Sequence, residues 1–462
     1  MTKPMSEPHC PSLRLQIVEK DGAARDGWQN CEIGRHIRFS TSGLESYFFE
    51  QWRPVIFDLL LVAAAVEFCD RRLSRPAHGW ARRFEVCIPV HDPERWSAAG
   101  VSRPLHEALS LLTGDSWSIA FTARTGDHPE VRQTSLPLSN RAQAVIAFSN
   151  GLDSRAVAGL VAAEMGDGLV RIRLGREPRD KLASKRERAP FTSIPYRVGG
   201  SGSMRLPETS ARSRGFKFAV ISLASAHLAK VRRIIVPESG QGALGPVLVP
   251  VGHAYADYRN YPQFTNLMEV FGAQLLETAI GYEFPRLWYT KGETLTAYQA
   301  IAPQSTVWSK TWSCWQQSRQ SSVSGKKRQC GICAACMLRR MSVHAAGLEE
   351  DPSRYVWERL SSATLNDGVA DGFERRRIGK AMREYALAGT LHLQHLAELN
   401  QAGAKKRGLD RIARQVGRLT GLTAQESEAK ATRLIGQHEK EWTAFTASLG
   451  SDSFVMNWAR GE

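Results

Sequence analysis

A short polar loop, SNGLDS at residues 149–154, separates two apolar stretches of the chain. The stretch before it predicts a buried strand at 144–148, and the Ala/Val/Leu pattern after it predicts a helix at 153–165. Backbone N–H groups of a loop that joins a strand to a helix N-terminus form a site for anions. The sequence therefore predicts a phosphate-binding loop, although Ser, Asn, Gly and Asp are also the ordinary residues of turns and helix N-caps.

The residues of this loop suit a nucleotide's pyrophosphate bound together with Mg²⁺. Gly151 permits backbone angles that a side chain would forbid, and Asn150 tolerates the left-handed region. Ser149 and Ser154 offer hydroxyls to phosphate oxygens. Asp153 would repel a bare phosphate, but it can hold a Mg²⁺ ion that bridges the phosphates. A Walker-type G-x-x-x-x-G-K-[ST] sequence does not occur in the chain. The residues expected to bind ATP are Ser149, Asn150, Gly151, Leu152, Asp153 and Ser154.

Four cysteines have the spacing of metal ligands, C-x15-C-x2-C-x2-C. They are Cys314, Cys330, Cys333 and Cys336. Four thiolates close a tetrahedral site that leaves no open position, so we expect a structural Zn²⁺ here. Disulfides, reactive thiols and an iron–sulfur cluster are the alternatives. The remaining cysteines are isolated in the sequence, and we expect them to be packed as small side chains.

The segment around the polar loop alternates strands with helices from about residue 140 to 300. Such alternation predicts a parallel sheet covered by helices on both faces, and hence an α/β fold. Ligands of such sheets bind at the carboxyl ends of the strands, so the loops after Phe148, Leu174 and Val236 are expected to open on one edge. The expected strands are 144–148, 169–174 and 232–237, and the expected helices are 153–165, 216–230 and 264–280.

Three domains are predicted along the chain. Residues 1–138 form an α+β domain, residues 139–345 hold the parallel sheet with a zinc-binding segment at 312–338, and residues 346–462 form a helical extension. The first domain shows no catalytic constellation. Its expected strands are 13–18, 36–41, 84–90 and 117–124, and its expected helices are 54–72 and 103–113.

Composition narrows the class of protein. The chain has 462 residues, 42% hydrophobic and 23% charged, and a formal net charge of +15. A basic balance suits nucleic acid, an acidic protein or a phosphorylated small molecule, but the basic clusters are scattered, so charge alone does not indicate a nucleic-acid partner.

The N-terminus has no apolar core that could serve as a secretory signal, and the longest apolar run, 59–66, is too short to cross a bilayer. We expect a cytoplasmic protein with no membrane partner.

Together, the polar loop and the cysteine cluster resemble the 7-cyano-7-deazaguanine synthase (QueC) family of PP-loop ATP pyrophosphatases. That family reads S-G-G-x-D-S, then T-W-S-C and C-G-x-C-x-x-C-x-x-R. The corresponding stretches here are SNGLDS (149–154), TWSCW (311–315) and QCGICAACMLRR (329–340), with Asn150 at a glycine position of the family. The resemblance covers roughly residues 142–345. It implies a central parallel sheet of the adenine nucleotide alpha hydrolase-like type, with ATP, Mg²⁺ and Zn²⁺ as cofactors.

Weaker likenesses between these motifs imply further site residues. The stretch ETSARSRGFKFAVISLASAHLA (208–229) is similar to the family's arginine-bearing helix, and it places Arg214 near the arginine position. YTKGET (289–294) is similar to the family's S/T-K-x-E and supplies Lys291. The resemblance implies that Asp153, Arg214 and Lys291 act in catalysis. In VPESGQG (236–242), Glu238 and Gln241 would bind the edge of the deazaguanine.

The chemistry that the resemblance implies is ATP-dependent. ATP adenylates the carboxylate of 7-carboxy-7-deazaguanine, an amine displaces AMP to give an amide, and a second adenylation dehydrates the amide to the nitrile.

Enlarged relatives occur in anti-phage defence operons of the Qat and type IV CBASS kinds. Because this chain carries extra residues on both sides of the matched segment, we hypothesise a C–N ligase that joins the deazaguanine to an amine of a partner protein from the same operon. The alternatives are a nitrile synthase for tRNA or DNA modification and a non-catalytic nucleic-acid-binding module.

Overall fold

The structure is a computed structural model of the 462-residue chain. It describes residues 10–19, 22–23, 25–44, 52–76, 79–125, 141–174, 191–201, 204–316 and 318–461. The chain forms two compact units. Unit 1 comprises Met1–Ala147, Met165–Val236 and Gln263–Glu283, and unit 2 comprises Phe148–Glu164, Pro237–Pro262 and Phe284–Glu462. The three-domain division along the sequence stays a prediction.

The first sheet of unit 1 is parallel throughout, in the order β2-β1-β4-β5. Along β4, Phe84 is buried and every residue from Val86 to Val90 is buried, so both faces of the strand are covered over its C-terminal half. The strands are β1 (Ser12–Val18), β2 (Gln29–Glu32), β4 (Arg83–Val90) and β5 (Ser116–Ala123), and the accompanying helices are α2 (Pro54–Arg72), α3 (Pro93–Ser97) and α4 (Ala99–Thr113). A short strand β3 (Ile37–Phe39) pairs antiparallel with β9 (Tyr196–Val198).

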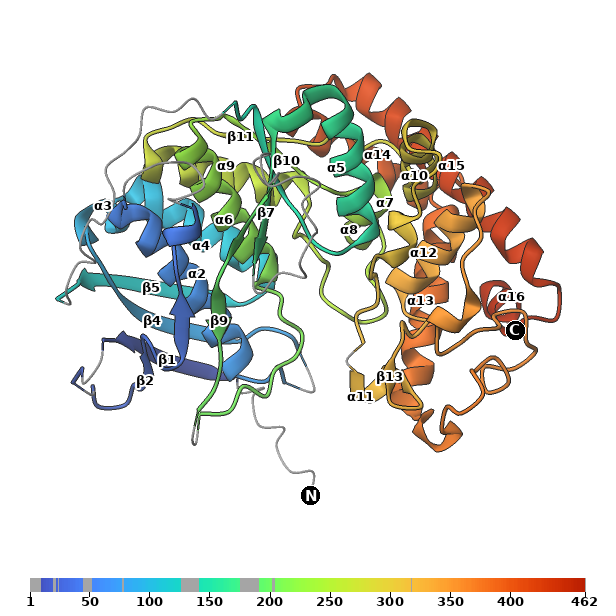
Figure 1. The fold of residues 1–462 in the computed structure, drawn as a ribbon, viewed down its shortest axis with the longest axis horizontal. Helices are drawn as coiled ribbons and strands as arrows, with labels where there is room; N and C mark the ends of the chain where they lie inside the picture. The colour runs from blue at the N-terminus through green and yellow to red at the C-terminus, as the bar shows by residue number, and fades with distance from the viewer. Residues whose placement is uncertain are drawn as a thin grey trace. The chain divides into compact units, whose positions relative to one another are not determined.

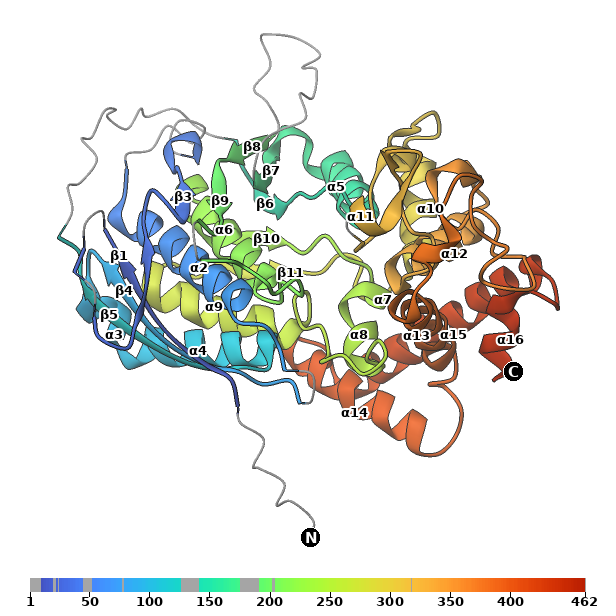
Figure 2. The ribbon, with the colours of Figure 1, turned by 90° about the horizontal axis from the view of Figure 1, so that it is seen from below.

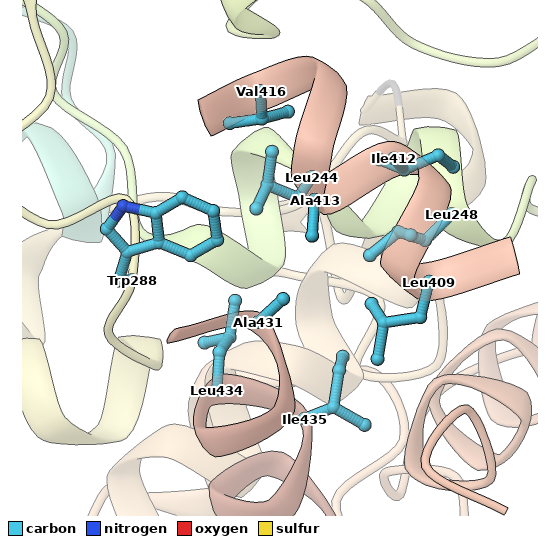
Figure 3. A pocket seen from close by; sticks show the side chains of 10 residues that line it. All are labelled: Leu244, Leu248, Trp288, Leu409, Ile412, Ala413, Val416, Ala431, Leu434 and Ile435. Carbon is cyan, nitrogen blue, oxygen red and sulfur yellow. The ribbon is translucent and has the colours of Figure 1, made fainter. Parts of the chain in front are cut away.

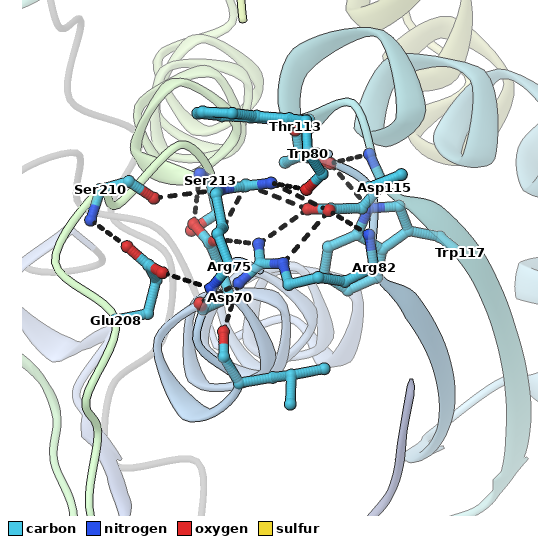
Figure 4. Close-up of polar contacts among 12 residues, drawn as sticks. Asp70, Arg75, Trp80, Arg82, Thr113, Asp115, Trp117, Glu208, Ser210 and Ser213 are labelled. Atoms are coloured by element: carbon cyan, nitrogen blue, oxygen red, sulfur yellow. Dashed lines mark hydrogen bonds and ion pairs between the residues drawn. The ribbon is translucent and has the colours of Figure 1, made fainter. Parts of the chain in front are cut away.

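A buried charge network stabilises this part of unit 1. The guanidinium of Arg82 is fully buried and pairs with Asp70 at 2.6 Å and with Asp115 at 2.7 Å. Arg75 also reaches Asp115, at 3.0 Å. Figure 4 shows Arg82 between the two carboxylates, and Glu208 accepts a hydrogen bond from the backbone N–H of Arg75 at 2.7 Å. Because each buried charge has an opposite partner, the network joins α2 to the residues just before β4 and β5 without leaving an uncompensated ion.

The second sheet of unit 1 confirms the predicted parallel α/β core. Its order is β11-β10-β6-β7-β8, and every pairing in it is parallel. The strands are β6 (Ala144–Ala147), β7 (Leu169–Leu174), β8 (Phe191–Ile194), β10 (Arg233–Ile235) and β11 (Gly281–Glu283). A 3-10 turn, η1 (Gly166–Gly168), leads into β7. Helix α6 (Arg214–Ala229) packs against β6 and β10 and also against α2, and α9 (Pro262–Leu276) precedes β11 (Figure 1).

Unit 2 is helical over most of its length, as predicted for the C-terminal region. Helices α12, α13 and α15 pack against one another, and they lie side by side in both Figure 1 and Figure 2. The buried rings of Trp357 and Trp442 belong to the same core as the four cysteines. The helices are α5 (Leu152–Met165), α7 (Gly240–Ala243), α8 (Gly245–Leu248), α10 (Lys291–Ile301), α11 (Ser318–Ser321), α12 (Ala334–Ala345), α13 (Lys380–Ala397), α14 (Ala404–Leu419), α15 (Ala424–Leu449) and α16 (Phe454–Arg460).

Short elements complete unit 2. A short hairpin precedes the last three cysteines, and each of its strands, β12 (Ser322–Val323) and β13 (Lys326–Lys327), has two residues. Short 3-10 helices occur at η2 (Val307–Lys310), η3 (Pro352–Arg354) and η4 (Arg375–Arg377). Apolar side chains of α8, α14 and α15 gather with Trp288 around a small pocket (Figure 3). Its lining residues are Leu244, Leu248, Trp288, Leu409, Ile412, Ala413, Val416, Ala431, Leu434 and Ile435.

The hydropathy of the helices bears on a membrane partner. Among the residues that the structure describes, no helix combines the length and the apolar character that crossing a membrane requires.

Candidate active site

The polar loop begins directly after β6 and is held by its own serines. The Oγ of Ser149 accepts a hydrogen bond from the backbone N–H of Gly151 at 3.1 Å and lies 2.8 Å from the Oγ of Ser154. Neither Asn150 nor Gly151 has a positive φ, so the loop does not use the left-handed backbone that the sequence suggested for them. A Cβ on Gly151 would lie 3.1 Å from the Oγ of Ser149. Glycine is therefore favoured here by close approach and not by a special backbone angle.

Helix α5 carries the acidic residue of the loop in its first turn. Asp153 and Ser154 are both buried, whereas Leu152 packs into an apolar cluster with Leu295 of α10 and so anchors the helix. A Cβ on Gly159 would lie 2.3 Å from the ring of Tyr298. This glycine therefore lets α5 approach α10 closely enough for their polar side chains to meet.

Lys291 and Asp153 form a buried ion pair. The Nζ of Lys291 lies 2.5 Å from Oδ2 of Asp153, and only 7% of Lys291 and 9% of Asp153 are exposed. Burial lowers the pKa of Lys291, but the charges of Asp153 and Glu238 outweigh that effect and leave the pKa raised. The lysine is therefore a permanent cation in this site. The structure thus brings together two of the three catalytic residues expected from the sequence.

Glu238 joins this cluster from the segment that follows β10. Burial and the charge of Asp153 raise the pKa of Glu238 to about 8, against the opposing effects of Lys291 and Arg259. The side chain of Asn260 donates a hydrogen bond to Oε2 of Glu238 at 3.0 Å. The remaining oxygen of Glu238, Oε1, and Oδ1 of Asp153 are buried and have no hydrogen-bond partner among the described residues.

The two carboxyl groups interact, and each has a buried oxygen without a donor, which is costly unless a proton or a cation compensates the charge. Oxygen ligands of this kind are those that Mg²⁺ prefers. Asp153 and Glu238 therefore have the chemistry of a divalent-cation site beside the polar loop, and Lys291 supplies a third charge next to it.

Arg259 is a residue of this cluster that sequence reasoning missed. Its Nε donates to Oδ2 of Asp257 at 2.8 Å, and the charges of Asp257 and then Glu238 raise its pKa. The only local signal was the run of charged and aromatic residues DYRNY at 257–261, between a glycine-rich stretch and α9. Such a run is equally typical of an ordinary surface loop.

Gln241 is buried in α7 and both polar atoms of its amide are already bonded. Its Oε1 accepts a hydrogen bond from the backbone N–H of Lys291 at 2.7 Å, and its Nε2 lies 2.7 Å from Nδ1 of His438. The position of Gln241 favours orienting α10 over contacting a substrate. Its predicted role in binding deazaguanine stays a prediction.

The N-terminus of α10 is a capping box. Thr290 accepts a hydrogen bond from the N–H of Glu293 at 3.0 Å, and the Glu293 side chain accepts one from the N–H of Thr290 at 2.8 Å. The Thr290 hydroxyl also donates to Oε1 of Glu441 at 2.5 Å, and Arg433 pairs with Glu293. Neither Glu441 nor His438 was expected from the sequence, because both lie on α15, far along the chain, in an ordinary amphipathic pattern.

The third expected catalytic residue, Arg214, is the first residue of α6 and belongs to unit 1. Its guanidinium lies 5.5 Å from the ring centroid of Phe218, one helical turn further along. The role of Arg214 in stabilising charge stays a prediction.

The four predicted zinc ligands come together. Their sulfur atoms all lie within 4.8 Å of one another, all four residues are buried, and Cys330 Sγ is 3.8 Å from Cys336 Sγ. Ligands at about 2.3 Å from a tetrahedral zinc lie about 3.8 Å apart, so the spacing fits Zn²⁺. Burial raises the pKa of Cys330 and Cys336, which means that a cluster of thiolates here requires a cation to stabilise it.

The cysteine segment is bonded to the polar loop. The backbone N–H of Trp312 donates to the carbonyl of Asn150 at 2.7 Å, and the indole N–H of Trp312 donates to the carbonyl of Cys314 at 3.1 Å. Arg339 of α12 is fully buried and links Glu350, at 2.6 Å, to the hydroxyl of Thr311, also at 2.6 Å. The segment that carries the four cysteines therefore supports the backbone of the polar loop.

Two comparisons with known proteins agree with this geometry. Residues 243–347 match the family described as "Queuosine biosynthesis protein QueC". The 7-cyano-7-deazaguanine synthase of Rhizobium rhizogenes is 26% identical over 228 residues, which cover 46% of this chain and 91% of that protein. No solved structure matches the chain. The segment that carries Lys291 and the four cysteines is therefore similar to proteins of the QueC family.

Proposed function

We propose that this chain is an ATP-dependent enzyme of the PP-loop kind that activates the carboxylate of a 7-deazaguanine. The observation that carries the proposal is the cluster of Lys291, Asp153 and Glu238 beside the polar loop 149–154, next to the four-cysteine site. The similarity of residues 243–347 to the QueC family supports the same class of substrate.

In the first step, each residue of the cluster binds a part of ATP or stabilises a charge. Ser149, Ser154 and the backbone of the loop bind the pyrophosphate part of ATP, and Asp153 and Glu238 would hold Mg²⁺. This assigns Glu238 to the metal in place of its predicted contact with the edge of the deazaguanine. When it is bound, Mg²⁺ neutralises phosphate charge. Lys291 stabilises the negative charge that builds up on the departing pyrophosphate, because a fixed buried cation acts on that charge without reorganisation. A carboxylate oxygen of the substrate attacks the α-phosphorus, and pyrophosphate leaves.

In the second step an amine nitrogen attacks the activated carbonyl carbon, AMP leaves with the former carboxylate oxygen, and a proton is released from the nitrogen. We propose that the amine belongs to a partner protein from the same operon and that the enzyme acts in anti-phage defence. The support is the size of the chain, since the matched relative aligns with only 46% of it. Formation of a small nitrile does not require the remaining residues.

A nitrile synthase is the second candidate, because the relative's own name is 7-cyano-7-deazaguanine synthase. In that case the amine is a small molecule such as ammonia, and a second ATP drives dehydration of the amide. The two candidates share the phosphate loop and differ in the acceptor and the end product.

Pyrophosphate release tests the shared step. We expect release to require both ATP and 7-carboxy-7-deazaguanine, and we expect Asp153→Ala to lower the rate at least about 100-fold, since it removes a charge that acts at the reacting phosphates. Asp167→Ala, at an exposed aspartate just after α5, is the matched control and should retain full activity. Equal turnover by the wild type and Asp153→Ala would refute the assignment of the loop.

Intact-mass spectrometry separates the two candidates. The protein is incubated with ATP, 7-carboxy-7-deazaguanine and the proteins encoded beside it, and the mass of each protein is recorded. The conjugation proposal expects one neighbour to gain the mass of the deazaguanine acyl group. Free nitrile with no protein adduct would establish the synthase instead.

A further inference from the structure

We propose that His438 and Glu441 of α15 are positioning residues for Lys291: they fix the N-terminus of α10 and thereby direct the lysine toward Asp153. The inference deepens the proposed function and rests on it, since it assigns to Lys291 the same role in the reaction. Helix α15 lies outside residues 243–347, where the chain matches the QueC family. The contacts of His438 and Glu441 with the N-terminus of α10 are therefore a feature of the additional C-terminal region.

The hydrogen bonds of His438 determine its protonation. One ring nitrogen, Nε2, lies 2.8 Å from the carbonyl oxygen of Leu393, and a carbonyl only accepts, so Nε2 carries the proton. Burial lowers the pKa of His438 to about 4, so the ring is neutral near pH 7 and Nδ1 is an acceptor. The nitrogen Nδ1 therefore accepts from the amide of Gln241, at 2.7 Å.

This hydrogen bond determines the orientation of the Gln241 amide. With Nε2 of Gln241 donating to His438, its Oε1 must point the other way, where it accepts from the backbone N–H of Lys291 at 2.7 Å. A chain of three hydrogen bonds thus runs from α13 through His438 and Gln241 to the first residue of α10. Each member is buried, so an alternative partner from solvent is excluded and a broken bond would leave a polar atom unsatisfied.

Glu441 acts on the same helix terminus one turn further along α15. Its Oε1 accepts a hydrogen bond from the Thr290 hydroxyl. The hydroxyl oxygen of Thr290 keeps a lone pair, which accepts from the N–H of Glu293. A Cβ on Gly292 would lie 2.9 Å from Oε1 of Glu441, which shows how closely the carboxyl approaches the backbone of α10. The residue between Thr290 and Gly292 is Lys291, so its backbone is held from both sides.

The test compares variants at His438 with a control on the same helix. His438→Leu removes both hydrogen bonds at similar volume, whereas His438→Asn retains an acceptor in the place of Nδ1. Thr446→Val is the control, because Thr446 is equally buried on α15 and bonds only within its own helix. Pyrophosphate release gives kcat and KM for each variant, and crystal structures give the distance from Lys291 Nζ to Asp153.

We expect His438→Leu to lower kcat about 10- to 100-fold, with KM for ATP changed less than about threefold, because a misdirected catalytic group slows the reaction more than it weakens binding. His438→Asn should recover at least part of this loss, and Thr446→Val should lose none. In crystals of His438→Leu, the Lys291–Asp153 ion pair should be broken or lengthened beyond 4 Å, the usual limit of an ion pair.

Two outcomes would overturn the inference: a kcat for His438→Leu within about twofold of the Thr446→Val value, or an unchanged ion pair in the His438→Leu crystal. If the wild type itself releases no pyrophosphate, the proposed function fails. The crystal structures still decide in that case whether His438 positions Lys291. A second variant, Glu441→Leu, tests the same terminus through Thr290 and should resemble His438→Leu in both measurements.

Discussion

The ammonium group of Lys291 lies 2.5 Å from the carboxylate of Asp153, inside unit 2 and away from solvent. Each residue sits in the first turn of its own helix, and the close packing of α5 on α10 at Gly159 brings the two turns together. A buried ion pair contributes little net stability compared with an apolar pair, but removal of one partner is costly. The proposed role in catalysis therefore explains this buried pair beside the polar loop better than a role in stability does.

The first prediction concerns removal of the cation. Lys291→Met should lower the rate of pyrophosphate release at least about 100-fold. It should also lower the free energy of unfolding by about 3–5 kcal/mol without Mg²⁺, because Asp153 and Glu238 then face each other with no cation. Added Mg²⁺ should restore part of this loss. Thermal unfolding with and without Mg²⁺ measures the effect, and Lys310→Met, at an exposed lysine, is the control. An Lys291→Met protein as stable as this control would contradict the prediction.

The second prediction concerns the space around Glu238. A Cβ on Gly242 would lie 2.1 Å from Oε1 of Glu238, so Gly242→Ala must displace that carboxyl from Asp153. We expect pyrophosphate release to fall about tenfold or more, with a higher Mg²⁺ concentration needed for half-maximal rate. Gly436→Ala, where the nearest atom is 3.6 Å away, should have no such effect. An unchanged Mg²⁺ dependence in Gly242→Ala would argue against Glu238 as a metal ligand.

The third prediction concerns the metal bound by the cysteines. Elemental analysis should find one zinc per chain, and Cys336→Ser or a strong chelator should remove it. Because metal-binding energy on the order of 10 kcal/mol contributes to folding, loss of zinc should unfold the segment around Trp312 and abolish pyrophosphate release. Cys10→Ser, at the exposed cysteine, should keep both zinc and activity. A metal-free protein that remains folded and active would refute a structural zinc.

The fourth prediction concerns the pH dependence of stability. Burial raises the pKa of Glu441 from 4.5 to about 7 in the folded protein. The folded state therefore binds this proton more tightly than the unfolded state, and the resulting stabilisation is fully present below about pH 4.5 and is lost as the pH rises through about 7.

Glu441→Gln keeps an acceptor for Thr290 but does not titrate. Relative to the wild type, its free energy of unfolding should therefore rise by about 2–3 kcal/mol between pH 5 and pH 8. Denaturant titrations at the two pH values measure the free energy of unfolding of the wild type and of Glu441→Gln. The contributions of the neighbouring Glu293 and His438 cancel in the difference between the two proteins, because both contain these residues. A difference that does not change with pH would show that Glu441 ionises normally.

The parts of this protein that were predictable from the sequence are those that depend on neighbours along the chain. The alternation of apolar strands and helices located β6, β7, β10 and the helices between them, because hydrophobic periodicity is a local signal. The cysteine spacing predicted that the four thiols come together as a possible metal site, since three of them lie within seven residues of the chain. The resemblance to the QueC family named Lys291 and Asp153.

The tertiary structure alone decided which side chains meet. Glu238 and Asp153 are brought within reach of one another, and Gln241 is bonded to Lys291 on one side and to α15 on the other. His438 and Glu441 lie on a helix whose sequence pattern describes only its amphipathic faces, and a pattern of that kind does not identify the partner of a buried polar group. Contacts between residues 50 or more positions apart depend on the packing of whole helices, and for that reason the sequence by itself did not reveal this half of the site.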